Sequence, residues 1–165
     1  MASSQEQKVF VGAAGELLVL SRLLLCGFVA GLLPSGSKAD DIYVERDSKP
    51  LRIQVKTRVG PLSWPTGYVT AKPDRFYALV HLDSLEDQDL ASAIVHLVPS
   101  RVVAKGVLTH ARLYGRAHPN QTGPGVLNVA DPWSLSTEMA KHGFGPGWLT
   151  NYREPWRAFR DGTLR

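Results

Sequence analysis

The first third of the sequence contains four side chains whose chemical types could act together on a phosphate group. Glu16 lies inside an apolar stretch, where burial of an unpaired carboxylate is unfavourable, so we expect a metal ion or its bound water to interact with it. Asp41, Gln54 and Lys56 follow in two short strand-like segments. Carboxylate and amide oxygens suit a hard cation such as Mg²⁺, which keeps water and substrate phosphate as its other ligands. A lysine beside such an ion can orient the attacking water and offset phosphate charge.

A predicted β-hairpin positions three of these residues. Strand-like runs at 42–46 and 51–58 flank a four-residue turn, and the length of the turn sets the register. This register places Asp41 opposite Lys56, with Gln54 two residues earlier on the same strand. Because side chains alternate between the two faces of a strand, we expect Asp41, Gln54 and Lys56 on one face, near one end of the hairpin.

The same register decides between two neighbouring aspartates. Alternation points Asp40 to the opposite face from Asp41, although a bulge would exchange the two. It also places Glu45 opposite Arg52, an opposite-charge pair that favours this register. Asp41 is therefore the predicted member of the site.

The elements around the hairpin follow from periodicity and turn residues. Apolar residues at three- and four-residue spacing predict a helix from about residue 4 to Gly27. Asn151 and Glu154 form a possible capping box that opens a last helix through Phe159. Other strands are predicted at 28–33, 68–71, 76–82 (a buried central strand) and 94–98, a short helix is predicted at 99–105, and residues 108–147 are left unassigned.

This order of elements predicts a mixed α/β fold, with a central mixed sheet of four to five strands flanked by helices. A length of 165 residues suits one domain, 1–165, with its core at about 5–105 and a C-terminal extension at 106–165. The net charge of +4 is compatible with a nucleic-acid partner without requiring one.

Cysteine content and hydropathy indicate where the protein is found. Cys26 is the single cysteine, so no internal disulfide is expected and a reducing cytoplasm is the predicted location. The apolar run 17–33 resembles a membrane segment, but Arg22 interrupts it before the roughly 20 apolar residues that a bilayer requires. We therefore expect no membrane anchor.

Three segments resemble a known family. GAAGE in the first helix, ADDIYV and RIQVKT are similar to the PD-(D/E)XK nuclease superfamily, the restriction-endonuclease-like fold, and especially to its small prokaryotic and phage members. The resemblance covers roughly residues 9–57. It implies that Asp41 binds Mg²⁺ or Mn²⁺, that Gln54 is a second ligand, that Glu16 assists the metal site and that Lys56 is the catalytic lysine.

The sequence departs from the family pattern at two positions. Gln54 stands where the family has Asp or Glu, so a ligand carbonyl is present without its negative charge and weaker metal binding is expected. Active members with Gln at this position exist, including a homing-endonuclease lineage. Asp40 precedes Asp41 where the family name has proline.

The resemblance implies a metal-dependent nuclease that hydrolyses phosphodiester bonds in DNA. Lys38, Arg58, Lys72 and Arg75 would contact phosphates and make binding depend on salt. A homodimer is expected by analogy with other proteins of this fold. One alternative is a catalytically weakened or inactive module of the same fold that binds nucleic acid or a protein. Another is an interaction protein that uses residues 108–165.

Each site residue also has a structural explanation. Asp41 could cap the loop that precedes the hairpin. Glu16 could pair with Arg22 or with a lysine elsewhere in the chain. Lys56 and its basic neighbours could form a strand edge that discourages aggregation.

Overall fold

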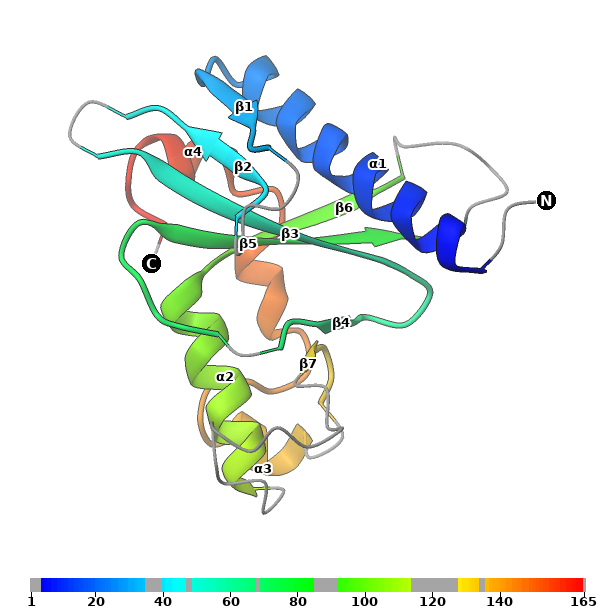
Figure 1. Cartoon of the computed structure of the whole chain (residues 1–165). Coiled ribbons are helices and arrows are strands. Elements are labelled where there is room, and N and C mark those ends of the chain that lie inside the picture. The colour runs from blue at the N-terminus through cyan, green and yellow to red at the C-terminus, as the bar shows by residue number, and fades with distance from the viewer. Residues whose placement is uncertain are drawn as a thin grey trace.

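The computed structural model describes residues 4–34, 40–46, 49–67, 69–84, 92–113, 128–133 and 136–164. These residues form a mixed α/β fold around a five-stranded sheet of order β1-β2-β3-β5-β6 (Figure 1). The prediction of a mixed sheet flanked by helices is confirmed. The elements are α1 (Ser4–Leu25), β1 (Ala30–Leu32), β2 (Ile42–Val44), β3 (Leu51–Val59), β4 (Ser63–Pro65), β5 (Arg75–Leu82), β6 (Ile94–Pro99), α2 (Ser100–Leu113), β7 (Asn128–Ala130), α3 (Ser136–Ala140), the 3₁₀ helix η1 (Trp148–Tyr152) and α4 (Trp156–Arg160).

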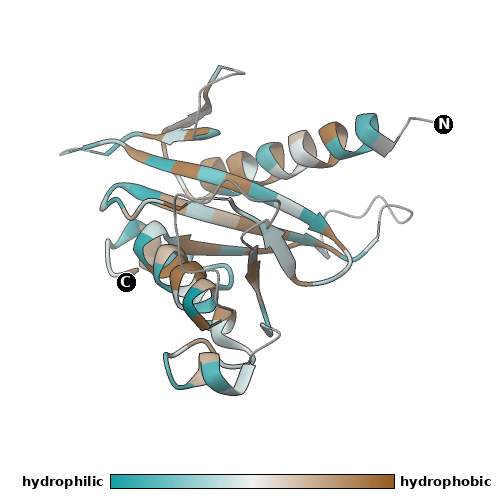
Figure 2. Cartoon of the chain, turned by 60° about the horizontal axis from the view of Figure 1, so that its bottom comes forward, coloured by the Kyte–Doolittle hydropathy of each residue, from teal (hydrophilic) through white to brown (hydrophobic). Residues whose placement is uncertain are grey.

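The sheet combines antiparallel and parallel pairs. β1, β2 and β3 form an antiparallel meander, β3 pairs in parallel with β5, and β5 pairs antiparallel with β6. β4 and β7 form a separate two-stranded sheet on the α2 side of the molecule (Figure 1). The alternation of polar and apolar residues along β3 can be followed in Figure 2. This alternation divides the side chains of β3 between the two faces of the sheet.

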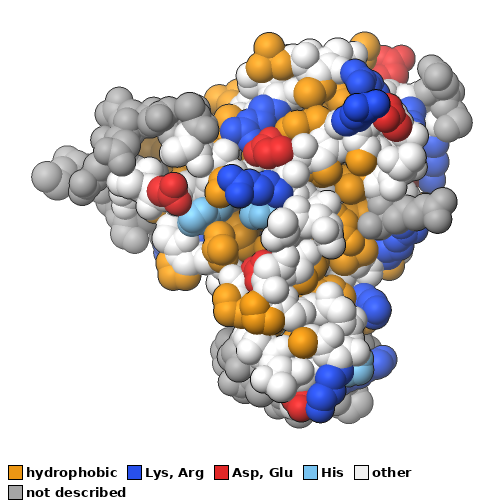
Figure 3. All heavy atoms as spheres, turned by 180° about the vertical axis from the view of Figure 1, so that it is seen from behind, with side chains coloured by type: hydrophobic (Ala, Val, Ile, Leu, Met, Phe, Trp, Pro, Cys, Tyr) orange, Lys and Arg blue, Asp and Glu red, His pale blue; other side chains and the backbone are white. Residues whose placement is uncertain are grey.

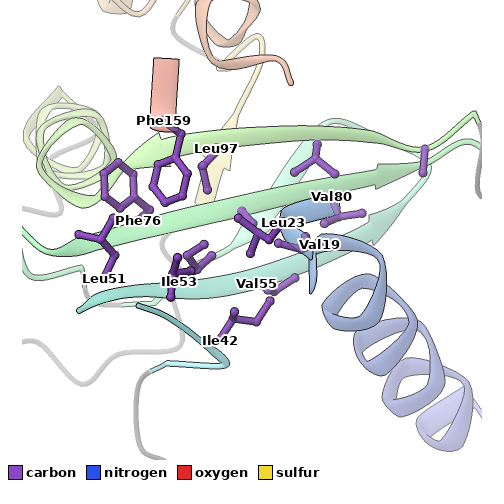
Figure 4. Close-up of a cluster of buried hydrophobic side chains, with 14 of the residues drawn as sticks. Val19, Leu23, Ile42, Leu51, Ile53, Val55, Phe76, Val80, Leu97 and Phe159 are labelled. Carbon is purple, nitrogen blue, oxygen red and sulfur yellow. The ribbon is translucent and has the colours of Figure 1, made fainter. Parts of the chain in front are cut away.

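Each face of the sheet has its own apolar core. On one face, Val19 and Leu23 of α1 pack on the sheet together with Phe159 of α4 (Figure 4). On the other face, α2, β4 and the segments around Trp133 and Trp148 form the second core. The strand at 76–82, predicted to be buried, contributes to both cores through alternate side chains. Because Phe159 lies in the first core, the C-terminal segment packs against the same sheet as α1.

The predicted register of the hairpin is wrong by two residues. Ile42 lies opposite Ile53 instead of Val55, and Val44 lies opposite Leu51. β2 ends at Val44, so the connection to β3 spans residues 45–50 instead of four residues. A shift of two keeps the paired side chains of β2 and β3 on their predicted faces, which is why the apolar face of the hairpin is still correct.

Some predicted elements also differ from the structure. Tyr43, not Glu45, lies opposite Arg52. The described residues 69–71 form no strand, whereas β4 lies earlier, with the buried Trp64 donating its indole N–H to the Val80 carbonyl at 2.8 Å. The helix predicted over 99–105 continues to Leu113 as α2. The added part of the helix contains the buried residues Gly106, Val107 and Ala111, and Gly106 lies against Trp133 and Phe144.

The predicted capping box is wrong, because Glu154 makes long-range contacts instead. Its carboxylate pairs with Arg22 of α1 and accepts the Val95 amide of β6 at 2.9 Å. The indole of Trp156 donates to it at 2.5 Å. Glu154 has a positive φ of 46° and links the C-terminal segment to α1 and β6. The pairing of Arg22 with Glu154 also removes the suggested pair between Arg22 and Glu16.

Candidate active site

The candidate site lies at the N-terminal end of β2, beyond which β3 continues. β2 begins at Ile42, and its register with β3 reaches only as far as Ile53. Beyond that point, at 54–59, no described strand pairs with β3 on this side. Asp41 covers the start of the open edge: its amide donates to the Ile53 carbonyl at 2.9 Å, and its Oδ2 accepts the Val55 amide at 2.7 Å. These two bonds join Asp41 to the residues of β3 on either side of Gln54, so its carboxylate contacts β3.

Helix α1 approaches the same edge through a glycine. An ideal Cβ on Gly15 would lie 1.8 Å from Oγ1 of Thr57, so only glycine allows the helix backbone to come this close to β3. Thr57 is the neighbour of Lys56, and Glu16 is the neighbour of Gly15. Close approach of the two backbones therefore brings Glu16 to the level of Lys56. Gly15 belongs to the spacing G-x-x-G-E, but the spacing alone does not predict this contact.

Electrostatics link three of the four residues. Burial raises the pKa of Glu16 from its ordinary value, the negative charge of Asp41 raises it further, and the positive charge of Lys56 acts in the opposite direction. Glu16 thus lies within electrostatic reach of both residues. Among the described residues, no ion-pair partner lies within 4 Å of either Glu16 or Lys56. The three charges are therefore not used by a structural ion pair.

Gln54 and Lys56 occupy strand positions on one face of β3. Gln54 lies beside Tyr77 and Lys56 beside Leu79 of β5, both of which belong to the core on the α2 side. Glu16 reaches the edge from the α1 side. Glu16, Asp41 and Lys56 therefore interact around an open strand edge, and Gln54 belongs to this edge by its strand position; the four residues do not lie on one flat face.

The carboxylate of Asp40 pairs with Arg75 and does not lie on the face that alternation predicts. Its Oδ1 lies 2.7 Å from Nε of Arg75, its Oδ2 accepts from Nη2 of Arg75 at 3.0 Å, and both side chains are only 11% exposed. Arg75 lies opposite Arg52 and so shares the face of Gln54. The expectation that Asp40 points to the opposite face is wrong, because the regular strand begins only at Ile42 and alternation does not extend to residues 40 and 41.

The donor atoms at the open edge fit a hard cation. The described residues contain no group of three or more His, Cys, Asp or Glu side chains placed to hold a metal. Two carboxylates and the side-chain carbonyl of Gln54 form an oxygen-only set, which suits Mg²⁺ with several waters. A cation here would relieve the repulsion between Glu16 and Asp41 that raises the pKa of Glu16. Asp41 Oδ1 accepts no hydrogen bond from the described residues and can serve as a ligand.

The predicted phosphate-binding residues do not form one patch. Lys38 lies outside the described residues. Arg58 is exposed near the end of β3, whereas Lys72 is exposed in the loop before β5, roughly 20 Å away along the sheet. The guanidinium of Arg75 is paired with Asp40. Seen from behind, Lys and Arg side chains gather along the edge that carries the hairpin and the C-terminal segment (Figure 3).

Comparison of the chain with protein-family models, curated proteins and solved structures found no match. No described helix combines the length and the apolar character that crossing a membrane requires. The chemistry of the candidate site is therefore argued from its own residues.

Proposed function

We propose that this protein is a metal-dependent phosphodiesterase of the restriction-endonuclease-like fold that acts on DNA, with Mg²⁺ or Mn²⁺ held by Asp41, Gln54 and Glu16. The observation that carries the proposal is the meeting of Glu16, Asp41 and Lys56 at the open edge of β3 without a structural ion pair. The family resemblance of residues 9–57 supports the same assignment.

In the proposed reaction, Asp41 helps to hold the cation and Lys56 positions the attacking water. When bound, the cation supplies Lewis-acid polarisation of the phosphate. The Val55 amide orients Asp41 by taking up one of its oxygens, which leaves the other for a ligand. Lys56 holds the attacking water by hydrogen bonding and offsets the negative charge that develops on the phosphate. The water oxygen bonds to phosphorus and loses a proton to solvent, while the bond to the leaving sugar oxygen breaks and this oxygen takes up a proton from solvent.

The test of this function uses plasmid and linear DNA with Mg²⁺ or Mn²⁺. We expect Lys56→Ala and Asp41→Asn each to reduce cleavage at least about 100-fold. Arg157→Ala, which changes an exposed arginine on α4, should cleave as the wild type does. Equal cleavage by wild type and by both site variants would refute the enzymatic function.

The second candidate function is a binding module without catalysis, and the neutral side chain of Gln54 favours it. Salt-dependent binding of DNA without cleavage would support this alternative. Gln54→Glu restores the charge of the family pattern and should increase affinity for Mg²⁺. If Gln54→Glu gains cleavage that the wild type lacks, the fold is catalytically competent and the wild-type residue is what weakens it. Absence of any nucleic-acid binding would favour the interaction protein that uses residues 108–165.

Contacts with DNA are proposed for Lys38, Arg58 and Lys72. Arg75 is left out because Asp40 neutralises it in a largely buried ion pair. Each lost phosphate contact should lower the salt dependence of binding by about one counterion. Arg58→Ala is therefore expected to weaken DNA binding similarly on all sequences, measured as a reduced slope of log affinity against log salt.

A homodimer is proposed through the outer face of α1. Phe10, Leu17 and Leu24 recur every seventh residue and are 64%, 57% and 51% exposed, so they form one apolar stripe. Val9 and Leu25, which are 65% and 84% exposed, add further exposed apolar surface to this helix. A second copy of the chain is the proposed occupant.

Leu17→Lys should shift the mass measured by sedimentation from dimer to monomer. Leu108→Lys changes a leucine on α2 that is 38% exposed, and it should leave the dimer intact. A monomeric wild type, or equal behaviour of the two variants, would exclude this interface.

A further inference from the structure

A second feature with ligand-binding character lies where β3 and β5 begin and β6 ends. A cavity of about 390 Å³ opens there, within the size range of small-molecule sites. Its inner walls are apolar and include Leu51, Phe76 and Phe159. Leu51 precedes Gln54 by three residues and Lys56 by five, so the cavity lies roughly 10 to 17 Å from the candidate active site along β3.

Three cationic side chains line this cavity. Arg46, Lys72 and Arg101 come from the hairpin loop, the loop before β5 and the first turn of α2. The described residues that line the cavity include no Asp or Glu. None of the three cations has an ion-pair partner within 4 Å among the described residues. Like charges around a cavity repel one another, so the arrangement favours an anionic occupant.

Two contacts place segments that carry these cations beside the cavity. The hydroxyl of Ser100, which is fully buried, donates to the Lys72 carbonyl at 2.8 Å and accepts the Lys72 amide at 2.9 Å, which fixes the backbone at Lys72. Arg46 lies against the backbone of Gly162: a Cβ there would be 2.5 Å from its Nη2. Arg46, Lys72 and Arg101 are all exposed, so their charged groups remain accessible to a ligand.

The start of α2 adds to the positive potential. Its first turn contains no acidic residue, although acidic side chains stabilise helix N-termini, and it contains Arg101 instead. Positive charge at this end of a 14-residue helix is unfavourable to the helix by itself. A bound anion would reverse that effect, because helix N-termini attract phosphate and carboxylate groups.

We propose that this cavity binds the phosphate monoester of a nucleotide. Two planar guanidinium groups and one ammonium match the charge and the several acceptor oxygens of a phosphate dianion. The apolar walls suit the base or sugar that carries the phosphate. The phosphate comes from a free nucleotide or from the 5′ end of a DNA strand. This inference goes beyond the proposed hydrolytic function, since it needs neither the metal nor Lys56.

The experiment measures binding to the full chain in EDTA at low salt. The probes are deoxyadenosine monophosphate, deoxyadenosine, and one oligodeoxynucleotide with a 5′ phosphate or a 5′ hydroxyl. Arg101→Ala and Lys72→Ala should weaken phosphate-dependent binding about 10-fold each. Arg157→Ala removes an exposed arginine that is outside the cavity, and it should bind as the wild type does.

The outcomes separate the two sources of phosphate. Binding of the mononucleotide but not of deoxyadenosine, lost in the cavity variants, identifies a free nucleotide. A preference for the phosphorylated oligonucleotide, lost in the same variants, identifies a DNA end. Binding that does not depend on the phosphate, or that is weakened as much by Arg157→Ala as by the cavity variants, overturns the proposal. Asp41→Asn, measured in EDTA, should keep the difference in binding between phosphorylated and unphosphorylated probes, so a failure of the hydrolytic function would leave this result unchanged.

Discussion

Replacing Gly15 by alanine should destabilise the protein, although the same change usually stabilises a helix. Alanine is favoured over glycine inside a helix by about 1 kcal/mol. At this position, however, the new Cβ would lie 1.8 Å from Oγ1 and 2.9 Å from Cβ of Thr57. Thr57 belongs to the strand at the centre of the sheet, so neither side of the contact can move cheaply.

The size of the effect follows from these opposing contributions. Added atoms in a packed contact cost about 1 to 3 kcal/mol. The neighbour here is Thr57, whose β-branched side chain has few rotamers and lies on a paired strand, so we expect a cost of about 3 kcal/mol. Subtracting the gain in helix propensity leaves a net loss of about 2 kcal/mol. For a chain of this length, each kcal/mol changes Tm by about 2 to 4 °C. We therefore expect Tm to fall by roughly 4 to 8 °C.

Gly12 provides the matched control, because it lies in the same helix and a Cβ there would have no neighbour within 4 Å. Gly12→Ala should raise Tm by about 2 to 4 °C. Thr57→Ala should partly rescue Gly15→Ala, because Oγ1 is removed while Cβ remains. Urea unfolding of the single and double variants measures this coupling. If both glycine variants are stabilised alike, α1 does not contact β3 at Gly15 and the placement of Glu16 is refuted.

Other substitutions test single contacts. Glu16→Gln should stabilise the protein at pH 7. Burial and the charge of Asp41 raise the pKa of Glu16 in the folded state, so the ionised carboxylate lowers the free energy of unfolding at pH values above its ordinary pKa of 4.5. Urea titrations should therefore show that the advantage of glutamine disappears below pH 4.5. Glu154→Ala should cost about 2 kcal/mol in urea unfolding, since it removes the carboxylate partner of Arg22 and the acceptor of the Val95 amide, whereas Glu138→Ala, in an exposed pair, should cost under about 0.5. Phe159→Ala should cost about 3 to 5 kcal/mol, and a surface-like value near zero would show that α4 does not complete the core.

The hairpin shows what local pattern can predict. Alternation assigned Ile42, Ile53 and Val55 to the buried face, and the structure agrees. The register failed because it assumed that β2 extends to residue 46, whereas the strand ends at Val44. Nothing in the local pattern marks that end. The Glu45 amide still bonds the Val29 carbonyl on the β1 side, whereas the described pairing of β2 with β3 stops at Val44 and Leu51.

Long-range pairing explains the remaining errors. Glu154 resembles a local capping residue in sequence, but its partners are 132 and 59 residues away along the chain. Arg75 resembles a free phosphate ligand, but its partner Asp40 is 35 residues away. Charge patterns identify which residues need partners, and the fold alone decides which partners they receive.

The short β2 strand connects these observations to the candidate site. An unpaired strand edge is a liability that proteins usually cover, and here Asp41 covers only the Val55 amide. If β2 extended two residues further back, its backbone would occupy the edge where Glu16 now meets Asp41 and Lys56. Gly15 then brings α1 close enough for Glu16 to reach that opening. The open edge therefore depends on where β2 begins, at Ile42, and not on its other end at Val44, which misled the register prediction.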